Sequence, residues 1–204
     1  MLKQPFFRFS MKGLPMSIIL ASASPRRREL LSLAGLDFEV RVPDVDERLD
    51  PAWTAAQAAR ALAEQKAAAA AQSFPGACVI AADTIVEIDG VLLGKPANAA
   101  DAARMLRLLS GSEHRVVTGV CLRLGEAARV FAQETLVRFY PLGEEEIEAY
   151  VRTGEPMDKA GAYGIQGRGA LLVEGITGDY FNVVGLPVAR LVRELKEMIK
   201  EGGI

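Results

Sequence analysis

The sequence predicts an α/β protein in which helices flank a mixed, twisted sheet, and three observations indicate this fold class. Short apolar runs typical of buried strands intermix with helical periodicity, without the strict alternation of a purely parallel sheet. The dipeptide Asp89-Gly90 between two apolar runs is typical of an antiparallel hairpin. The chain has 204 residues, 50% of them hydrophobic and 25% charged, which suffices for one domain with a substantial core.

Strands are predicted where short apolar or alternating runs are bounded by turn residues. A wholly apolar run begins at Cys78 and indicates a buried strand that ends before Asp83. Two long runs around Gly125 and a shorter pair around Gly178 indicate hairpins. The expected strands are 17–21, 38–42, 78–82, 85–88, 91–93, 115–124, 129–139, 171–176 and 180–184.

Helices are predicted where capping residues precede a 3.6-residue periodicity. Ser24 followed by Pro25 is typical of an N-cap and a first helical position, and Gly35 is expected to end that helix. Thr54 and Gln57 have the spacing of a capping box at the start of an alanine-rich helix. That helix is expected to reach about residue 71, and the others to span 98–110, 144–152 and the chain from 187 onwards.

The first apolar run also decides the domain organisation. We expect residues 1–15 to be a loose N-terminal extension and residues 16–204 to form a single domain, because Met16 opens the first structured segment. The N-terminus imitates a signal peptide, but its apolar stretch, 16–20, is shorter than the roughly 7–15 residues that a signal needs. No apolar run approaches the roughly 20 residues that span a bilayer. We therefore expect a cytoplasmic protein without a membrane partner.

Charge and residue counts restrict the chemistry. The formal net charge is -2, and aromatic and basic residues do not interleave, so a nucleic-acid partner is disfavoured and any anion site must be built locally. Cys78 and Cys121 lie in apolar runs and are interpreted as small core residues. The one histidine, His114, is given no role. One histidine and two cysteines do not easily make a zinc site without carboxylates, and a catalytic triad could use only His114. Chemistry is expected from carboxylates, lysines, arginines and a hard metal ion.

The segment SASPRRRELL, residues 22–31, opens a helix with the arginines Arg26, Arg27 and Arg28 in its first turn. Free backbone N–H groups at a helix start attract anions, and arginines add forked donors that match phosphate oxygens. Because these side chains oppose the helix dipole, they bring no structural gain there. This pattern favours a phosphate site over a solvated basic surface.

Three further candidates are single polar residues near apolar runs. Asp83 and Thr84 follow the run 78–82, and an acid at a strand end is well placed to hold a metal ion or a water molecule, although a turn-forming aspartate has similar weight. The acidic loop around Glu47 could supply a second carboxylate or be a solvated surface. Lys95, in LGKP, is a candidate phosphate contact, but the P-loop pattern fails because proline replaces the Ser or Thr that binds the metal.

The segment DKAGAYGIQGRG, residues 158–169, holds four glycines. It lacks the GxGxxG pattern and does not open a helix, so a Rossmann dinucleotide site is rejected. Glycines would let the backbone approach a ligand here, and Tyr163 or Gln166 could meet a base edge. A plain glycine-rich surface loop is the alternative.

Together these segments resemble the Maf family of nucleotide pyrophosphatases. The resemblance rests on SASPRRRELL, ALAEQKA, AADTIV, LGKP, DKAGAYGIQG and YFNVVGLP in the family order, and covers residues 16–193. It implies cleavage of a nucleoside triphosphate between the α- and β-phosphates with a divalent metal cation. It also implies a two-lobed α/β fold with a central cleft, similar to inosine triphosphate pyrophosphatases, and is compatible with a homodimer.

The resemblance assigns roles to eight residues. It implies that Asp83 is the general base and that Asp83 and Glu47 bind Mg²⁺ or Mn²⁺. Arg27 and Lys95 complete the catalytic group, and Lys66, in ALAEQKA, faces the phosphates. Three more positions are linked to substrate choice: Arg26, Thr84 and Gln166.

The form DKAGAYGIQG looks like the branch of the family that hydrolyses dTTP and UTP. The family is also associated with cleansing of modified nucleotides and with arrest of cell division. Two alternatives stay open: a pyrophosphatase for 7-methyl-GTP or another non-standard nucleotide, and a nucleotide-binding regulator of cell division without catalysis.

Overall fold

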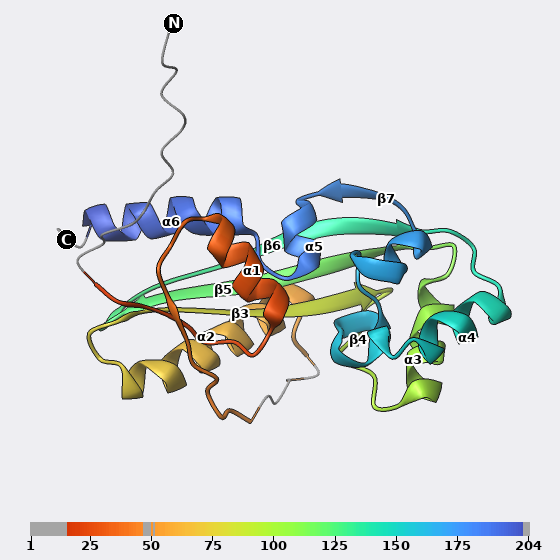
Figure 1. Cartoon of the computed structure of the whole chain (residues 1–204), viewed down its shortest axis with the longest axis horizontal. Helices are drawn as coiled ribbons and strands as arrows, with labels where there is room; N and C mark the ends of the chain where they lie inside the picture. The colour runs from red at the N-terminus through yellow and green to blue at the C-terminus, as the bar shows by residue number, and fades with distance from the viewer. Residues whose placement is uncertain (1–15, 47–49, 51, 202–204) are drawn as a thin grey trace, which may run out of the picture.

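The computed structural model describes residues 16–46, 50 and 52–201, and within them seven strands form one mixed sheet (Figure 1). The expected N-terminal extension, 1–15, lies outside the described residues. The strands are β1 (Ile18–Leu20), β2 (Glu39–Val40), β3 (Cys78–Ile88), β4 (Val91–Leu93), β5 (Glu113–Leu124), β6 (Ala127–Phe139) and β7 (Val173–Gly178). The α-helices are α1 (Pro25–Leu33), α2 (Ala55–Ser73), α3 (Ala99–Leu109), α4 (Glu144–Arg152), α5 (Tyr180–Val184) and α6 (Val188–Glu201). Three 3-10 helices follow α4: η1 (Glu155–Asp158), η2 (Ala160–Ala162) and η3 (Gly167–Leu172).

The strand order is β2-β1-β3-β5-β6-β7, with β4 beside β3. β1 runs parallel to both of its neighbours, and the other pairs are antiparallel. This combination confirms the predicted mixed sheet. The two long pairings, of β3 with β5 and of β5 with β6, make the centre of the sheet.

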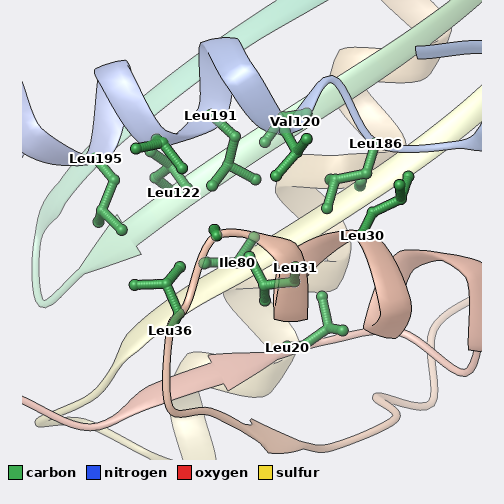
Figure 2. Packing of buried hydrophobic residues seen from close by; sticks show 14 of the residues in the cluster. Leu20, Leu30, Leu31, Leu36, Ile80, Val120, Leu122, Leu186, Leu191 and Leu195 are labelled. Atoms are coloured by element: carbon green, nitrogen blue, oxygen red, sulfur yellow. The ribbon is translucent and has the colours of Figure 1, made fainter. Parts of the chain in front are cut away.

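Alternate residues of β3 face opposite layers of helices, as the two-residue period of a strand requires. Ile80 and Ala82 belong to the first core cluster, which joins the sheet to α1 and α6 (Figure 2). Val79 and Ala81 instead contact the alanines of α2, on the other face. Figure 1 accordingly shows α6 above the long strands and α2 below them.

α2 packs unusually close to the sheet. Its buried residues are almost all alanines, and it crosses β5 at Gly119. A Cβ atom at Gly119 would lie 2.2 Å from the backbone carbonyl of Ala59, so only glycine allows this approach. The small side chains on both elements therefore fix the distance between α2 and the central strands.

A second core cluster fills the other end of the sheet, under α3 and α4. Met105 and Leu109 of α3 pack there with Phe139 of β6 and with Tyr163. His114 is buried in this cluster, and its Nε2 lies 2.7 Å from the Tyr163 hydroxyl. Burial lowers the pKa of His114 to about 4, so the ring is neutral near pH 7.

The predicted capping signals are confirmed. The Ser24 side chain accepts a hydrogen bond from the Arg27 amide at the start of α1, and Thr54 and Gln57 form the capping box of α2. The hairpin at Asp89-Gly90 joins β3 to β4, with positive φ angles at both residues. Both cysteines are buried, as expected for core residues.

Several strand predictions differ from the structure. β3 does not stop at residue 82; it continues through Asp83 and Thr84, because β5 pairs with it from Cys78 to Glu87 and satisfies its backbone on that side. Residues 180–184 form helix α5 instead of a strand, because the Asp179 side chain caps the Phe181 amide at 2.8 Å. The predicted hairpin around Gly178 is therefore also wrong, and β7 pairs with β6 instead. β2 is also shorter than the expected 38–42.

Within the described part of the chain, no helix has the length and apolar character needed to cross a bilayer.

Candidate active site

A gap along one edge of β3 creates a cleft. β1 pairs with β3 only as far as Ile80, and β4 pairs with it from Val86. Among the described residues, no strand covers the edge between them, and this is the stretch that carries Asp83 and Thr84. The cleft at this gap has a volume of about 560 Å³, and members of the first and second core clusters are among the residues that line it. Its position beyond the carboxyl end of β1 is typical of ligand sites in α/β proteins.

Seven of the eight sequence-predicted site residues line this one cleft: Arg26, Arg27, Lys66, Asp83, Thr84, Lys95 and Gln166. The eighth, Glu47, lies outside the described residues.

Asp83 and Lys66 form an ion pair at the floor of the cleft. Asp83 points to the α2 face of the sheet, where Lys66 Nζ donates to its Oδ1 at 2.5 Å. Their side chains are only 13% and 12% exposed, so water screens this pair much less than a surface pair. The residue opposite Asp83 on β5 is Gly119, which leaves the room that α2 needs to bring Lys66 in.

Thr84, the next residue, points to the other face and holds Arg27. The Arg27 guanidinium donates to Thr84 Oγ1 at 3.0 Å and to the Gly185 carbonyl oxygen at 2.9 Å. A longer contact of 3.4 Å reaches Ser22 Oγ. These bonds fix the direction of the guanidinium before any ligand arrives. Arg27 is therefore preorganised for an anion in the cleft.

A chain of hydroxyl groups runs inward from Arg27. Thr118, directly opposite Thr84, is fully buried and donates its proton to the Asn182 carbonyl oxygen at 3.0 Å. Because that proton is used, Thr84 must donate in its 2.9 Å contact with Thr118 and accept from Arg27. The hydroxyl of Thr84 is thus occupied in positioning Arg27. Sequence reasoning missed Thr118, since an isolated threonine in an apolar strand carries no signal.

Asn182 closes this network from α5. Its amide nitrogen donates to the Val116 carbonyl oxygen at 2.9 Å and to Thr135 Oγ1 at 3.0 Å. Asn182 is fully buried, and its position within YFNVVGLP was the available signal for it. Its bonds tie α5, and with it the Gly185 carbonyl, to the sheet.

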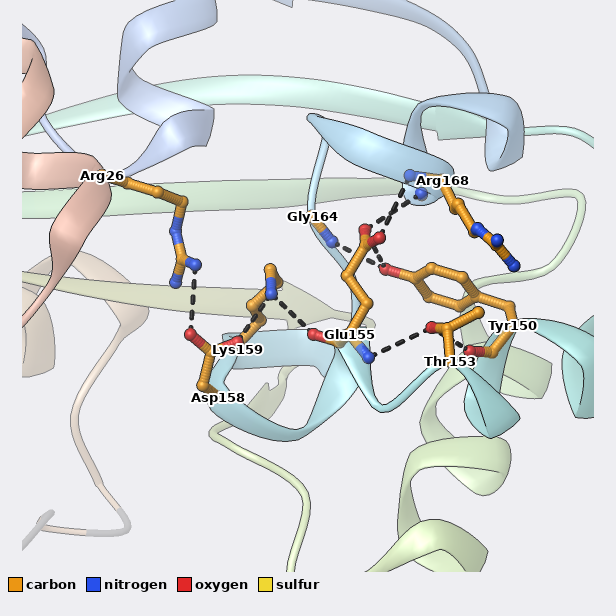
Figure 3. A network of polar contacts seen from close by, with 9 residues as sticks. Arg26, Tyr150, Thr153, Glu155, Asp158, Lys159, Gly164 and Arg168 are labelled. Carbon is orange, nitrogen blue, oxygen red and sulfur yellow. Dashed lines mark hydrogen bonds and ion pairs between the residues drawn. The ribbon is translucent and has the colours of Figure 1, made fainter.

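Arg26 lies on the same helix as Arg27 but reaches across the cleft. Its guanidinium bonds Asp158 Oδ2 at 3.1 Å, and Lys159 Nζ bonds Asp158 Oδ1 at 2.6 Å (Figure 3). Burial alone would raise the pKa of the Asp158 carboxyl, but the Lys159 hydrogen bond and the Arg26 charge outweigh it and hold the pKa below its ordinary value. Asp158 therefore balances part of the positive charge of Arg26 and Lys159 in the cleft lining.

Lys95 and Gln166 complete the lining with exposed side chains. Lys95 follows β4 and makes no hydrogen bond or ion pair within the described residues. Gln166 sits in the glycine-rich segment, between η2 and η3. Both side chains are therefore accessible to a ligand.

The carboxylates in the cleft fit a hard divalent cation only in part. Among the described residues, no group of three or more His, Cys, Asp and Glu side chains is arranged to hold a metal ion. Mg²⁺, however, is commonly bound by one or two carboxylates together with substrate phosphates and water. Asp83 has the right donor type, and its Oδ2 accepts no hydrogen bond from the described residues. The donor set thus suits a cation that arrives with a phosphate ligand.

Comparison with known proteins identifies the family. The model of the family described as Maf-like protein matches residues 17–198. The chain belongs to the Maf family. A dTTP/UTP pyrophosphatase from Symbiobacterium thermophilum is 55% identical over 180 residues, which cover 88% of this chain and 93% of that protein. A dTTP/UTP pyrophosphatase from Bacillus cytotoxicus is 54% identical over 179 residues, covering 88% and 94%.

A solved structure supports the fold assignment. The Ham1 protein of Staphylococcus aureus superposes with a TM-score of 0.52 at 16% identity, covering 89% of this chain and 99% of that one. At this identity the likeness concerns the Maf fold alone. It agrees with the mixed sheet and flanking helices described above.

Proposed function

We propose that this Maf protein is a nucleoside triphosphate pyrophosphatase that hydrolyses dTTP and UTP to the monophosphate and pyrophosphate. The observation that carries the proposal is the convergence of Asp83, Lys66 and Arg27 in one cleft. The relatives that are dTTP/UTP pyrophosphatases cover most of the chain at over 50% identity, which supports the same substrates here.

The cations of the cleft supply charge neutralisation. A triphosphate repels an attacking nucleophile, and hydrolysis needs fixed positive charge on both sides of the bond that breaks. Arg27, Lys66 and Lys95 would hold the phosphate chain and stabilise pyrophosphate as it leaves. Because Arg27 is already fixed by its protein bonds, it reorganises little when the substrate binds.

Asp83 is the proposed general base. Its carboxylate would orient a water molecule towards the α-phosphorus and take its proton. With Glu47 and phosphate oxygens, Asp83 would also bind Mg²⁺ or Mn²⁺, both of which prefer oxygen ligands. When bound, the cation would supply Lewis-acid chemistry that lowers the pKa of water and so offsets the weak basicity of a carboxylate.

The opposite wall is proposed to select the base. Gln166 carries an amide that can both donate and accept, as the edge of a pyrimidine requires. Arg26 and Thr84 would act on selectivity more indirectly, since Arg26 bonds Asp158 and Thr84 orients Arg27. We expect the enzyme to act on the cytoplasmic nucleotide pool, including modified pyrimidine triphosphates, with a link to arrest of cell division.

The test is pyrophosphate release from a panel of triphosphates with Mg²⁺ or Mn²⁺, in the presence and absence of EDTA. We expect UTP and dTTP to be the best substrates and EDTA to abolish turnover. Preferential hydrolysis of 7-methyl-GTP, or tight UTP binding without pyrophosphate release, would overturn the proposal.

A single substitution tests the assigned base. Asp83→Asn should lower kcat on the order of 10²-fold or more, because the amide cannot accept the proton. Asp37→Asn, an exposed residue outside the cleft, is the matched control and should keep wild-type turnover. Circular dichroism verifies that both variants are folded. Near-normal turnover of Asp83→Asn would exclude the assignment.

A further inference from the structure

The carboxylate of Glu155 organises the loop that carries Gln166. Oε1 accepts hydrogen bonds from the Tyr150 hydroxyl at 3.0 Å and from the Gly169 amide at 3.1 Å, and Oε2 accepts one from the Arg168 amide at 3.1 Å (Figure 3). The backbone of one turn is therefore bound by a single side chain from η1.

Tyr150, from α4, connects Glu155 by hydrogen bonds to the other end of the loop. Its hydroxyl oxygen accepts a hydrogen bond from the Gly164 amide at 3.2 Å while donating to Glu155. The two anchored ends, Gly164 and Arg168-Gly169, flank Gln166 in the sequence. We call residues 164–169 the recognition turn.

The glycines of the recognition turn are fitted around these two side chains. A Cβ at Gly169 would lie 2.2 Å from the Gly164 carbonyl oxygen and 2.6 Å from the Tyr150 hydroxyl. Gly167 has a φ of +66°, and a Cβ there would lie 2.8 Å from Glu155 Oε2. The turn closes on Glu155 because it has no side chains at these points.

Glu155 does not line the cleft, so its influence on a ligand passes through the turn. Burial alone would raise the pKa of its carboxyl, but the Gly169 and Arg168 amides and the Tyr150 hydroxyl outweigh it and keep the pKa below the ordinary value. The carboxylate form that accepts all three bonds is thus the stable one near pH 7.

We propose that Glu155 is a positioning residue for nucleotide selectivity: by holding both sides of the recognition turn, directly and through Tyr150, it presents the Gln166 amide to the nucleobase. The inference rests on the proposed function, because it assigns base recognition to Gln166. The residues proposed to bind the phosphates lie elsewhere, on α1, on α2 and in the segment after β4. Loosening the turn should therefore affect base recognition while leaving the phosphate chain and the reacting water in place.

The experiment compares Glu155→Gln with Glu145→Gln, an exposed control on α4. The amide of Glu155→Gln offers one acceptor oxygen in place of two, so one backbone amide of the turn loses its partner. We expect KM for UTP to rise about tenfold with kcat nearly unchanged, and the preference for UTP over CTP to fall by a similar factor. A purely structural role would lower kcat through loss of active protein and leave KM and selectivity unchanged.

Tyr150→Phe provides a second test that keeps the ring packing. It removes the hydroxyl that bridges Glu155 and Gly164, so KM and selectivity should change in the same direction, and the double variant should be less than additive. If wild-type protein releases no pyrophosphate from UTP, the proposed function fails. If the wild type is active while both single variants keep its KM and selectivity, only the role of Glu155 is refuted.

Discussion

The close contact between α2 and β5 predicts a strong effect of Gly119→Ala, a change remote from any ligand atom. The new methyl carbon would lie 2.2 Å from the Ala59 carbonyl atoms, whereas ordinary contacts begin at 3.4 Å. Because the obstacle is backbone, no side-chain rotation relieves it, and the helix must retreat by about 1.2 Å. Lys66 lies two turns further along the same helix.

The retreat acts on both stability and catalysis. Overpacking of this kind typically costs about 1–3 kcal/mol, which corresponds to a fall in Tm of roughly 2–12 °C for a protein of this size. A shift of the whole helix would lengthen the 2.5 Å contact from Lys66 to Asp83 to at most about 3.7 Å, which is beyond hydrogen-bonding distance. Misplacement of about 1 Å at a catalytic group can lower kcat by up to ~10²-fold.

Thermal unfolding and steady-state pyrophosphate release measure the two effects. Gly76→Ala is the control, because a Cβ there meets nothing within 4 Å, and it should behave as the wild type. A Gly119→Ala protein with unchanged Tm and turnover would show that α2 does not rest on the strand backbone and would refute the reasoning.

Two further predictions concern buried polar groups. Thr118→Val keeps the side-chain shape but removes the hydroxyl group that links Thr84 to the Asn182 carbonyl oxygen. Because Thr84 orients Arg27, kcat/KM for UTP should fall about tenfold. An unchanged kcat/KM would show that these hydroxyl groups do not position Arg27. Burial lowers the pKa of His114 from 6.5 to about 4 in the folded protein, so this residue's contribution to the free energy of unfolding is fully present above pH 6.5 and is lost as the pH falls towards 4. From pH 7 to pH 5 this loss is on the order of 2 kcal/mol. His114→Gln should remove that part of the pH dependence in urea titrations, and an identical dependence in both proteins would exclude it.

Local signals in the sequence predicted most of the elements. Caps at Ser24 and Thr54 and the hairpin at Asp89-Gly90 depend on neighbouring residues only, so they could be read without the fold. The prediction that the strand ends before Asp83 failed for a long-range reason. β5 pairs with β3 beyond that point, along Asp83 and Thr84, and this pairing cannot be seen in the local sequence. The apolar pattern ends at residue 82 because the next side chains face the cleft instead of the core, but the strand itself continues.

The residues of the candidate site also fall into those that the sequence predicted and those that it did not. Lys66 and Gln166 were expected in the site from their motifs, and the structure finds both in the cleft, although their roles stay proposals. Thr118 and Glu155 could not be expected, since each acts through backbone or hydroxyl groups brought together by tertiary packing. A side chain that satisfies a distant turn looks, in the sequence, like any other polar residue.

The first core cluster unites opposite ends of the chain: Leu20 and Leu31 pack with Leu191 and Leu195 of α6 (Figure 2). During synthesis, the N-terminal strand and helix leave the ribosome well before the residues that cover them. A nascent chain that stops short of Gly185 also lacks the carbonyl oxygen that holds Arg27. The packing of this cluster can therefore be completed only after α6 has been synthesised, and until then the leucines of β1 and α1 lack the partners that cover them in the folded protein.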